Sequence, residues 1–400
     1  MSTITFDPLD PQLLTAPQIV YERLRNEAPL LSTVVGGQTV HLVSRYADVA
    51  RIISDPSARM NPPGSDAPAV YGDGPAAELW RSAISMMDPP QHTRARRVIA
   101  RPFSLRRVEQ MRSMVADIVN EIFSELPSNQ LEVVNDLALR VPMQVICKLL
   151  GIPAEDWPSL QAWTTDFLHI FLPNVGGAEE IARVQKASQN FINYFGGMID
   201  ARRAQPRDDI TSDFAALVDK ENGISRIGLI GALRGLLTAG FETTAATISA
   251  AFLGFAKQPE QLELLRQNPE LIPGAVDELL RWETPVQVLV RYLGRDIEPN
   301  GGSLQAGAAC WLLLGSANHD PRHYPHPDKL DVSRAATDHH AFGGGRHFCV
   351  GAYLARLELQ LVLQQMSQRY RRIELQCESA ARKRNFQFPS IERLPVALVS

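Results

Sequence analysis

The chain has 400 residues, 45% of them hydrophobic and 21% charged, and a formal net charge of -4. This composition is that of a globular protein with enough apolar material for a large core. The near-neutral balance gives no indication of nucleic acid or membrane lipid as a partner.

The N-terminus has no basic flank followed by an apolar stretch, and no run of about 18 uninterrupted apolar residues occurs anywhere. We therefore expect neither a signal peptide nor a membrane anchor, and we expect a cytoplasmic protein that is a monomer.

The first 60 residues predict a β-hairpin followed by a helix. Residues 31–43 read LSTVVGGQTVHLV, two strand-like runs around Gly36 and Gly37. Ser44 is expected to cap a helix over 45–54. The next segment, 61–75, is too rich in proline and glycine for regular structure.

From about residue 91 to residue 283 the apolar spacing is mostly helical. Breaks are expected at Gly151–Pro153, Pro173–Gly177 and Pro206–Asp209. Short strand-like runs return at 286–297 and 309–314, a last long helix follows residue 351, and the tail 372–400 is strand-like. No repeat or composition shift marks a linker, so we predict one mainly α domain over 1–400 with a minor β part.

Residues 225–256 form the longest apolar helical segment. As one helix they would be about 48 Å long, enough to cross a domain. Gly231, Gly235 and Gly240 each cost about 1 kcal/mol relative to alanine in a helix. Something must pack close to the backbone at these glycines, and the sequence leaves open whether it is a ligand or another helix.

The chain has four cysteines and no CxxC pair. Cys147, Cys310 and Cys377 lie in apolar strings, where buried packing is expected. Cys349 differs, because it lies in FGGGRHFCVG, residues 342–351, directly before the last long helix.

The chemistry of Cys349 depends on whether it is ionised, because the thiolate is both the nucleophile and the metal ligand. A helix N-terminus stabilises an anion by less than about 1 kcal/mol as a rule and by about 2 kcal/mol at best, whereas a bound metal ion deprotonates a thiol outright. Glycines 343, 344, 345 and 351 allow the backbone to approach something flat and bulky, and Phe342 could pack against it or shield the sulfur. Two interpretations compete: a catalytic thiol and a metal thiolate, with haem iron favoured. No resolving cysteine or His/Asp relay is recognisable to support the first.

FGGGRHFCVG matches the haem-binding signature of the cytochrome P450 family, Phe-x-x-Gly-x-(His/Arg)-x-Cys-x-Gly, at every fixed place. The resemblance covers nearly the whole chain, since further motifs occur in the family's order. It implies a P450-type fold with a long central helix and a b-type haem whose iron is bound by the Cys349 thiolate. In that family a thiolate ligand favours O–O cleavage. Phe342, Gly343 and Gly351 are then expected to contact the haem.

The segment AGFETT, 239–244, resembles the family's oxygen-activation motif. The resemblance implies that Ala239 and Gly240 lie at the haem, with Gly240 leaving room for dioxygen. Glu242 would relay protons and Thr243 would hydrogen-bond to the oxygen, because oxygen activation needs delivered protons. The alternative is that Glu242 is an ordinary ion-paired helix residue and Thr243 a packing residue.

Two further groups of charged residues follow from the resemblance. Glu278 and Arg281 stand at i and i+3 in ELLR, and with Arg334 they would form a buried structural network. The haem propionates would be bound by His92, Arg96, Arg291 and His347. His319, His323 and His326 could suggest zinc, but they lack an HExxH pattern, and the resemblance implies a packed irregular segment there.

Oxygen activation needs two electrons, and the chain carries no flavin or nicotinamide motif. The resemblance implies a separate ferredoxin and ferredoxin reductase. A basic cluster is a candidate docking surface, with a solvated face as the alternative. It comprises Arg94, Arg97, Arg101, Arg106 and Arg107.

The pocket implied by the resemblance is lined by 61–87, 164–174, Arg234–Ala239, Val286–Val290 and Asn385–Phe388. These segments favour a mainly apolar small organic substrate, with Gln287 and Asn385 as possible polar anchors. The leading hypothesis is a monooxygenase that inserts one atom of dioxygen into this substrate. Oxidative coupling, dehydrogenation or isomerisation by the same haem thiolate stays open. A haem sensor is a weaker alternative, because a sensor has no need of an acid–alcohol pair.

Overall fold

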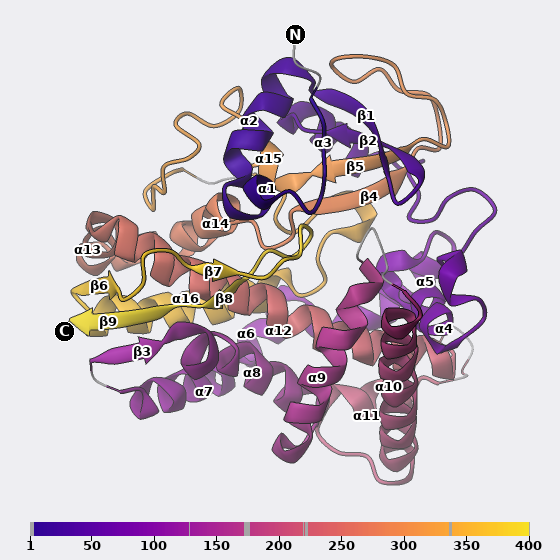
Figure 1. Cartoon of the computed structure of the whole chain (residues 1–400). Helices are drawn as coiled ribbons and strands as arrows, with labels where there is room; N and C mark the ends of the chain where they lie inside the picture. Colours follow the sequence, from indigo (N-terminus) through magenta and orange to yellow (C-terminus); the bar gives the residue numbers. More distant parts are fainter. Residues whose placement is uncertain are drawn as a thin grey trace. The chain divides into compact units, whose positions relative to one another are not determined.

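The chain is mainly helical, with small β-sheets (Figure 1). A computed structural model describes residues 4–127, 129–171, 177–218, 220, 223–335 and 338–399. Their contacts group the chain into two compact units, which we describe separately. Unit 1 comprises 1–58, 109–142 and 242–400, and unit 2 comprises 59–108 and 143–241. The mainly α class with a minor β part is confirmed, and one domain over 1–400 stays a prediction.

Three helices contribute residues to both units: α6 (Leu105–Gln110), α8 (Arg140–Leu150) and α12 (Arg226–Lys257). In its described residues, unit 2 otherwise contains longer helices and single 3₁₀ turns. The helices are α4 (Pro75–Ser82), α5 (Gln91–Ile99), α9 (Trp157–Leu168) and α10 (Ala178–Ala204), followed by the short α11 (Ile210–Ala215). The turns are η1 (Ala69–Tyr71), η2 (Ile84–Met86), η3 (Arg101–Phe103), η5 (Ala154–Asp156) and η6 (His169–Phe171). Helix α10 contacts α4, α9 and α11.

Unit 1 contains the remaining helices. They are α1 (Pro11–Thr15), α2 (Pro17–Glu27), α3 (Tyr46–Ile53), α7 (Arg112–Glu125), α13 (Pro259–Gln267), α14 (Ile272–Trp282), α15 (Leu314–Ala317) and α16 (Ala352–Arg369). Single turns are the π-helical η4 (Val134–Ala138) and the 3₁₀ turns η7 (Pro269–Leu271) and η8 (Gly345–His347). Helix α16 contacts α7, α13 and α14.

All the sheets seen in the described part of the chain belong to unit 1. The largest has the strand order β1-β2-β5-β4, and the others are β3-β9-β6 and β7-β8. The strands are β1 (Leu30–Val35), β2 (Gln38–Val43), β3 (Gln130–Glu132), β4 (Val288–Tyr292), β5 (Ala309–Leu313), β6 (Arg372–Leu375), β7 (Ala381–Arg382), β8 (Ile391–Arg393) and β9 (Pro395–Val399). The expected hairpin is confirmed: β1 and β2 pair antiparallel, and the φ angles of Gly36 and Gly37 are 56° and 78°.

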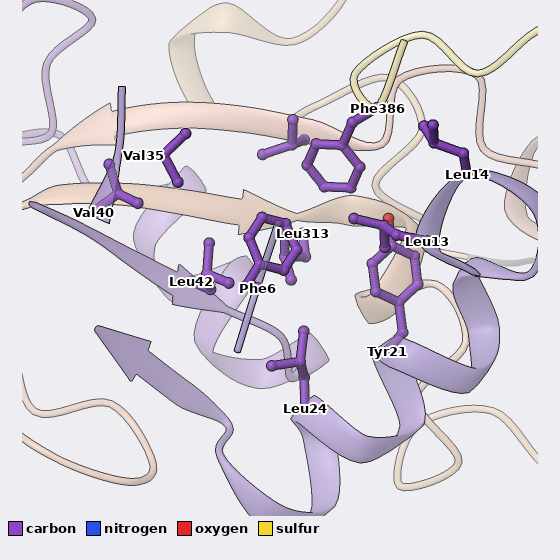
Figure 2. Packing of buried hydrophobic residues seen from close by; sticks show 11 residues of the cluster. Phe6, Leu13, Leu14, Tyr21, Leu24, Val35, Val40, Leu42, Leu313 and Phe386 are labelled. Carbon is purple, nitrogen blue, oxygen red and sulfur yellow. The ribbon is translucent and has the colours of Figure 1, made fainter. Parts of the chain in front are cut away.

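The four-stranded sheet is covered by residues from both ends of the chain. Phe6 packs edge-on against Phe386, with ring centroids 5.4 Å apart, and Trp311 of β5 stacks on the same Phe386 ring. Tyr21 of α2 is fully buried in this cluster (Figure 2). Burial of such aromatic side chains is a main source of stability. These contacts therefore anchor the N-terminal segment to the four-stranded sheet within unit 1.

The predicted cap of α3 is wrong. Ser44 Oγ donates a hydrogen bond to the Pro29 carbonyl instead, at 3.2 Å, and does not cap the helix. The backbone N–H group of Tyr46, the first residue of α3, donates to Asp320 Oδ2 at 3.0 Å. A carboxylate from a distant part of the sequence therefore satisfies this helix terminus, as local residues usually do.

Helix α12 is continuous over 32 residues, as the sequence predicts. It is long and apolar enough to cross a membrane, but 67% of its most apolar window is buried inside the protein, and the core helix of a water-soluble protein passes the same test. A Cβ atom at Gly231 would lie 2.6 Å from the Ser82 carbonyl oxygen, and one at Gly240 would lie 3.1 Å from Ile146 Cγ1. These two glycines therefore allow other helices to approach. Gly235 has nothing within 4 Å of its Cβ position.

The expected helix breaks at Gly151–Pro153 and Pro206–Asp209 are confirmed, since α8 ends at Leu150 and α10 at Ala204. The break at Pro173–Gly177 lies almost wholly outside the described residues. Segment 61–75 is irregular as expected, except for the turn η1. Cys147 and Cys310 are buried, which raises the pKa of each thiol to about 12. The prediction for Cys377 is wrong, because it is partly exposed on the chain's surface.

Candidate active site

A loop closed by a backbone hydrogen bond carries Cys349 directly before α16. The Cys349 N–H donates to the Phe342 carbonyl at 2.9 Å, which closes the loop. Gly343 and Gly345 have φ angles of 70° and 59°, a conformation that favours glycine. A Cβ atom at Gly345 would lie 2.5 Å from the Ile53 carbonyl oxygen, so this glycine allows the loop to approach the end of α3. At Gly351 the Cβ position is open.

The ring of Phe342 is fixed by a cation–π contact with Arg356, which is itself held by Asp277. The guanidinium of Arg356 lies over the Phe342 ring, 4.5 Å from its centroid, and Arg356 Nε donates to Asp277 Oδ1 at 2.9 Å. His339 Nε2 is 3.1 Å from the same carboxylate oxygen. Burial by itself raises the pKa of Asp277, but the His339 hydrogen bond and the Arg356 charge outweigh it and hold the pKa below its usual range. Helices α14 and α16 thus fix the first residue of the cysteine motif.

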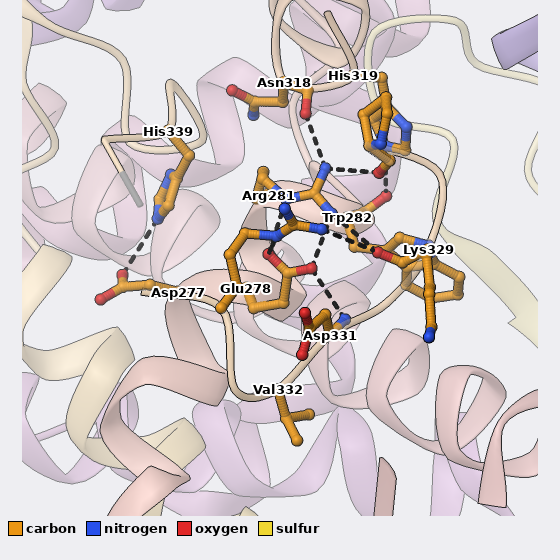
Figure 3. A network of polar contacts seen from close by, with 12 residues as sticks. Asp277, Glu278, Arg281, Trp282, Asn318, His319, Lys329, Asp331, Val332 and His339 are labelled. Carbon is orange, nitrogen blue, oxygen red and sulfur yellow. Dashed lines mark hydrogen bonds and ion pairs between the residues drawn. The ribbon is translucent and has the colours of Figure 1, made fainter. Parts of the chain in front are cut away.

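The predicted Glu278–Arg281–Arg334 network is present, and Figure 3 shows Glu278 and Arg281 at its centre. Arg281 Nε lies 2.7 Å from Glu278 Oε2, and Arg334 Nε lies 3.0 Å from the same oxygen. Neither Glu278 nor Arg281 is exposed at all, and Arg281 also donates to the carbonyls of Asn318 and Pro327. Since every charge is paired, the network joins α14 to the irregular segment 318–334 without leaving an isolated buried ion.

Glu242 on α12 has a cationic partner. Lys383 Nζ lies 3.0 Å from Glu242 Oε2, and the two side chains are 42% and 15% exposed. One turn after Thr243, the Thr247 hydroxyl donates to the Thr243 carbonyl at 3.1 Å. The carboxylate is therefore directed by a residue of the C-terminal segment, at the end of strand β7.

The other predicted site residues lie on separate elements. In unit 2, His92 on α5 is buried, Arg96 on the same helix is half-buried, and Ala239 and Gly240 lie on α12. In unit 1, Arg291 lies on β4, only 3% exposed, with Nη1 donating to the Val290 carbonyl at 2.8 Å. His347 ends the turn η8.

His319 and His323, two of the three histidines of the proline-rich segment, are bonded to other protein groups. His319 contacts Asp328 Oδ1 at 2.8 Å and the Trp282 carbonyl at 2.9 Å. His323 contacts Asp338 and stacks on Tyr46 with ring centroids 3.5 Å apart. These contacts hold the segment in place, as the resemblance implies.

Gln287, expected as a possible polar anchor for a substrate, has a protein partner at both ends of its amide. Its Oε1 accepts from the Tyr21 hydroxyl at 2.9 Å, and its Nε2 donates to the Thr284 carbonyl at 2.6 Å. The side-chain Oδ1 of Asn385 accepts from the backbone N–H groups of Gln387 and Phe388, which shapes its own loop. The sequence does not reveal these pairings, because they depend on tertiary contacts.

Sequence reasoning missed Lys383, Asp277 and Arg356. The only signal for Arg356 was its place in the helix after the cysteine motif, four residues from Ala352. Lys383 and Asp277 are ordinary charged residues in the sequence, and their roles become visible only through the partners they contact.

The arrangement around Cys349 suits a metal that brings most of its ligands with it. Among the described residues, no three His, Cys, Asp or Glu side chains come together as a metal site. A protein-built zinc site needs three or four such ligands. Haem iron needs a single axial ligand from the protein, because the porphyrin supplies the others. Three features of the chain fit this cofactor. Cys349 is partly exposed, and the Cβ position of Gly351 is open. Cationic residues on other elements would bind the haem propionates.

Comparison with known proteins agrees with this fit. A model of the family "Cytochrome P450" matches residues 12–390. Mycinamicin IV hydroxylase/epoxidase of Micromonospora griseorubida is 34% identical over 347 residues, 85% of this chain and 84% of that protein. 6-Deoxyerythronolide B hydroxylase of Saccharopolyspora erythraea is 30% identical and covers 94% of this chain and 95% of its own length.

Solved structures show the same fold. P450BioI, in complex with an acyl carrier protein ligated to hexadec-9Z-enoic acid, superposes with a TM-score of 0.89. Its sequence is 28% identical, and the match covers 97% of this chain and 99% of P450BioI. The chain therefore belongs to the cytochrome P450 family of oxygenating oxidoreductases, which bind haem iron through a cysteine thiolate.

Proposed function

We propose that this P450 monooxygenase binds its haem iron through Cys349 and oxidises a mainly apolar organic molecule. The observation that carries the assignment is the loop geometry at Cys349. The bond from its N–H to the Phe342 carbonyl and the left-handed Gly343 and Gly345 hold the cysteine before α16. With haem bound, the cofactor supplies the activation of dioxygen.

Replacement of the cysteine tests this assignment. In Cys349→Ser the reduced protein with carbon monoxide should lose the red-shifted Soret band of thiolate ligation, and turnover should fall below detection. Cys377→Ser, a second partly exposed cysteine, should keep both. An unchanged band in the Cys349 variant would contradict the proposal.

Protons for the reaction are proposed to pass through Glu242 and Thr243. Glu242 is partly exposed, which allows it to exchange protons with solvent, and Lys383 fixes the direction of its carboxylate. A carboxyl group beside a hydroxyl on one helix can deliver protons to bound oxygen. This proposal requires only that these side chains hold and move a proton.

The remaining haem contacts are proposals from the family resemblance. His92, Arg96, Arg291 and His347 would bind the propionates, and Ala239, Gly240, Phe342, Gly343 and Gly351 would contact the porphyrin. Burial of Arg291 and His92 supports a role beyond solvation, because a buried cation or donor normally serves a partner.

We also propose a cytoplasmic enzyme that receives electrons from a separate ferredoxin and its reductase. Support comes from the exposed arginines of unit 2, a basic surface suited to an acidic partner. They are Arg94, Arg97, Arg101, Arg106 and Arg107. The names of the mycinamicin IV hydroxylase/epoxidase and the 6-deoxyerythronolide B hydroxylase support an organic substrate.

A further inference from the structure

Helix α12 carries a buried cation in the segment that the sequence assigns to the pocket lining. Arg234 is only 5% exposed, and no hydrogen bond reaches its buried Nε from any described residue. Among the described residues no acidic group affects the pKa of Arg234, which burial lowers to about 10. The guanidinium therefore stays charged at neutral pH, without a carboxylate beside it.

In the described part of the chain, an aromatic ring compensates this charge in part. Arg234 Cζ lies 4.4 Å from the centroid of the Phe167 ring on α9. A cation over a ring face is stabilised by the ring quadrupole, but the ring cannot accept the hydrogen bonds of a planar fork of donors. The contact orients the guanidinium and leaves its buried Nε–H without an acceptor among the described residues.

A second buried polar group without a hydrogen-bond partner among the described residues lies on α9. Thr164 is fully buried, and its hydroxyl oxygen has no hydrogen-bond partner among the described residues. It precedes Phe167 by three residues, so both side chains lie on one side of α9. Next to Arg234, the Cβ position of Gly235 has no atom within 4 Å. Buried polar groups are almost always paired. An unpartnered nitrogen of Arg234, which contacts the Phe167 ring, and an unpartnered Thr164 hydroxyl one helical turn before Phe167 therefore indicate a missing ligand.

We propose that Arg234 and Thr164 form an anion subsite that binds the carboxylate of an otherwise apolar substrate. The planar guanidinium matches a carboxylate with two parallel hydrogen bonds, and the hydroxyl adds a third donor. A single cation among aromatic and apolar residues suits a monoanion better than a phosphate, which carries nearly two charges. The inference rests on the proposed function and names the substrate class of the same enzyme.

The test compares matched acids and neutral analogues on the haem-loaded protein. Tetradecanoic acid, methyl tetradecanoate and tetradecan-1-ol form one set, and 4-phenylbutanoic acid with its methyl ester and alcohol forms another. Isothermal titration calorimetry at pH 7.5 gives each Kd. At least one acid should bind about 10- to 100-fold more tightly than its ester and alcohol, the range expected for charge-assisted hydrogen bonds.

Variants then assign the preference to the subsite. Arg234→Met should remove the preference for the acid, Arg234→Lys should keep part of it, and Thr164→Val should reduce it slightly. Arg203→Met replaces an exposed arginine of α10 in the same unit and should leave the preference unchanged. If Arg234→Met does not fold, Arg234→Gln serves the same purpose, and the wild-type comparison needs no variant.

The inference is overturned if no acid binds more tightly than its neutral analogues, or if the preference survives in Arg234→Met. Such a failure is distinct from failure of the proposed function, because the carbon monoxide band of thiolate ligation would still be present in the wild-type protein.

Discussion

At the scale of single residues, the pair Lys383–Glu242 links the proposed proton path to the C-terminal segment. A half-exposed ion pair contributes less than about 1 kcal/mol to stability. Its importance here is orientation, because the 3.0 Å contact fixes which way the Glu242 carboxylate points. A proton donor outside hydrogen-bond reach contributes little to catalysis.

Lys383→Met should therefore lower the fraction of electrons that end in product by about 3- to 10-fold, part of the roughly 10²–10⁴-fold contribution of a positioned acid. The measurement is product formed per NADH consumed, and hydrogen peroxide released should rise in parallel. Lys383→Arg should retain most of the coupling, and Arg384→Met, an exposed neighbour, should retain all of it. Equal coupling in Lys383→Met and wild type would show that the pair has no such role.

Asp277 gives a prediction for acid stability. Its pKa is lowered despite burial, by His339 and Arg356. A depressed carboxyl pKa contributes stability above the unfolded value, near 3.9, that is lost as the pH falls through the folded value. Asp277→Asn should thus be less stable than wild type by about 1–3 kcal/mol at pH 7.

The difference in free energy of unfolding between wild type and Asp277→Asn should narrow as the pH falls below about 4, because protonation of wild-type Asp277 removes the same charge. Urea unfolding of both proteins at a series of pH values measures this difference in stability. A difference that is constant down to pH 3 would mean that the charge of Asp277 does not stabilise the fold.

At the scale of elements, α12 combines two kinds of glycine. Gly231 faces Ser82 so closely that a Cβ atom would lie 2.6 Å from a backbone oxygen, which cannot easily move, whereas Gly235 faces open space. The sequence marks both as poor helix formers, and it does not say which one has a close neighbour.

Gly231→Ala should destabilise the protein by about 1–3 kcal/mol through the steric conflict. Gly235→Ala should stabilise it by about 0.5–1 kcal/mol, because alanine favours the helix and nothing obstructs its methyl group. Denaturant unfolding of the two variants gives matched measurements in one helix. Changes of the same sign in both variants would contradict the assigned contacts.

At the scale of the whole molecule, electron supply depends on a partner protein. The basic residues of unit 2 are exposed, and attraction between opposite charges accelerates association at low ionic strength. Which of them meet the partner is decided by the arrangement of α5, η3 and α6.

Arg97→Glu combined with Arg101→Glu should slow reduction by an acidic ferredoxin by about 10-fold at low salt and weaken its dependence on ionic strength. Stopped-flow reduction at several salt concentrations measures both effects. Arg203→Glu, an equally exposed arginine on α10, is the control and should change neither by more than about 2-fold. A double variant with wild-type rate and salt dependence would exclude this docking surface.

The resemblance to the P450 family predicted the Glu278–Arg281–Arg334 network. The sequence by itself determined the mainly α class, the hairpin at Gly36–Gly37 and the long helix. It did so because periodicity, turn residues and the cysteine motif are local patterns along the chain. The same patterns gave the haem-thiolate chemistry through the family signature around Cys349.

Only the tertiary structure decided which side chains meet. Asp320 caps α3 in place of Ser44, Gln287 is bonded to Tyr21, and Lys383 pairs with Glu242 across 141 positions of sequence. Arg234 looks like any helical arginine until burial and the Phe167 ring reveal a charge without an acid. The physical reason is that hydrogen bonds and ion pairs act over a few ångströms in space, and separation along the chain does not determine that distance.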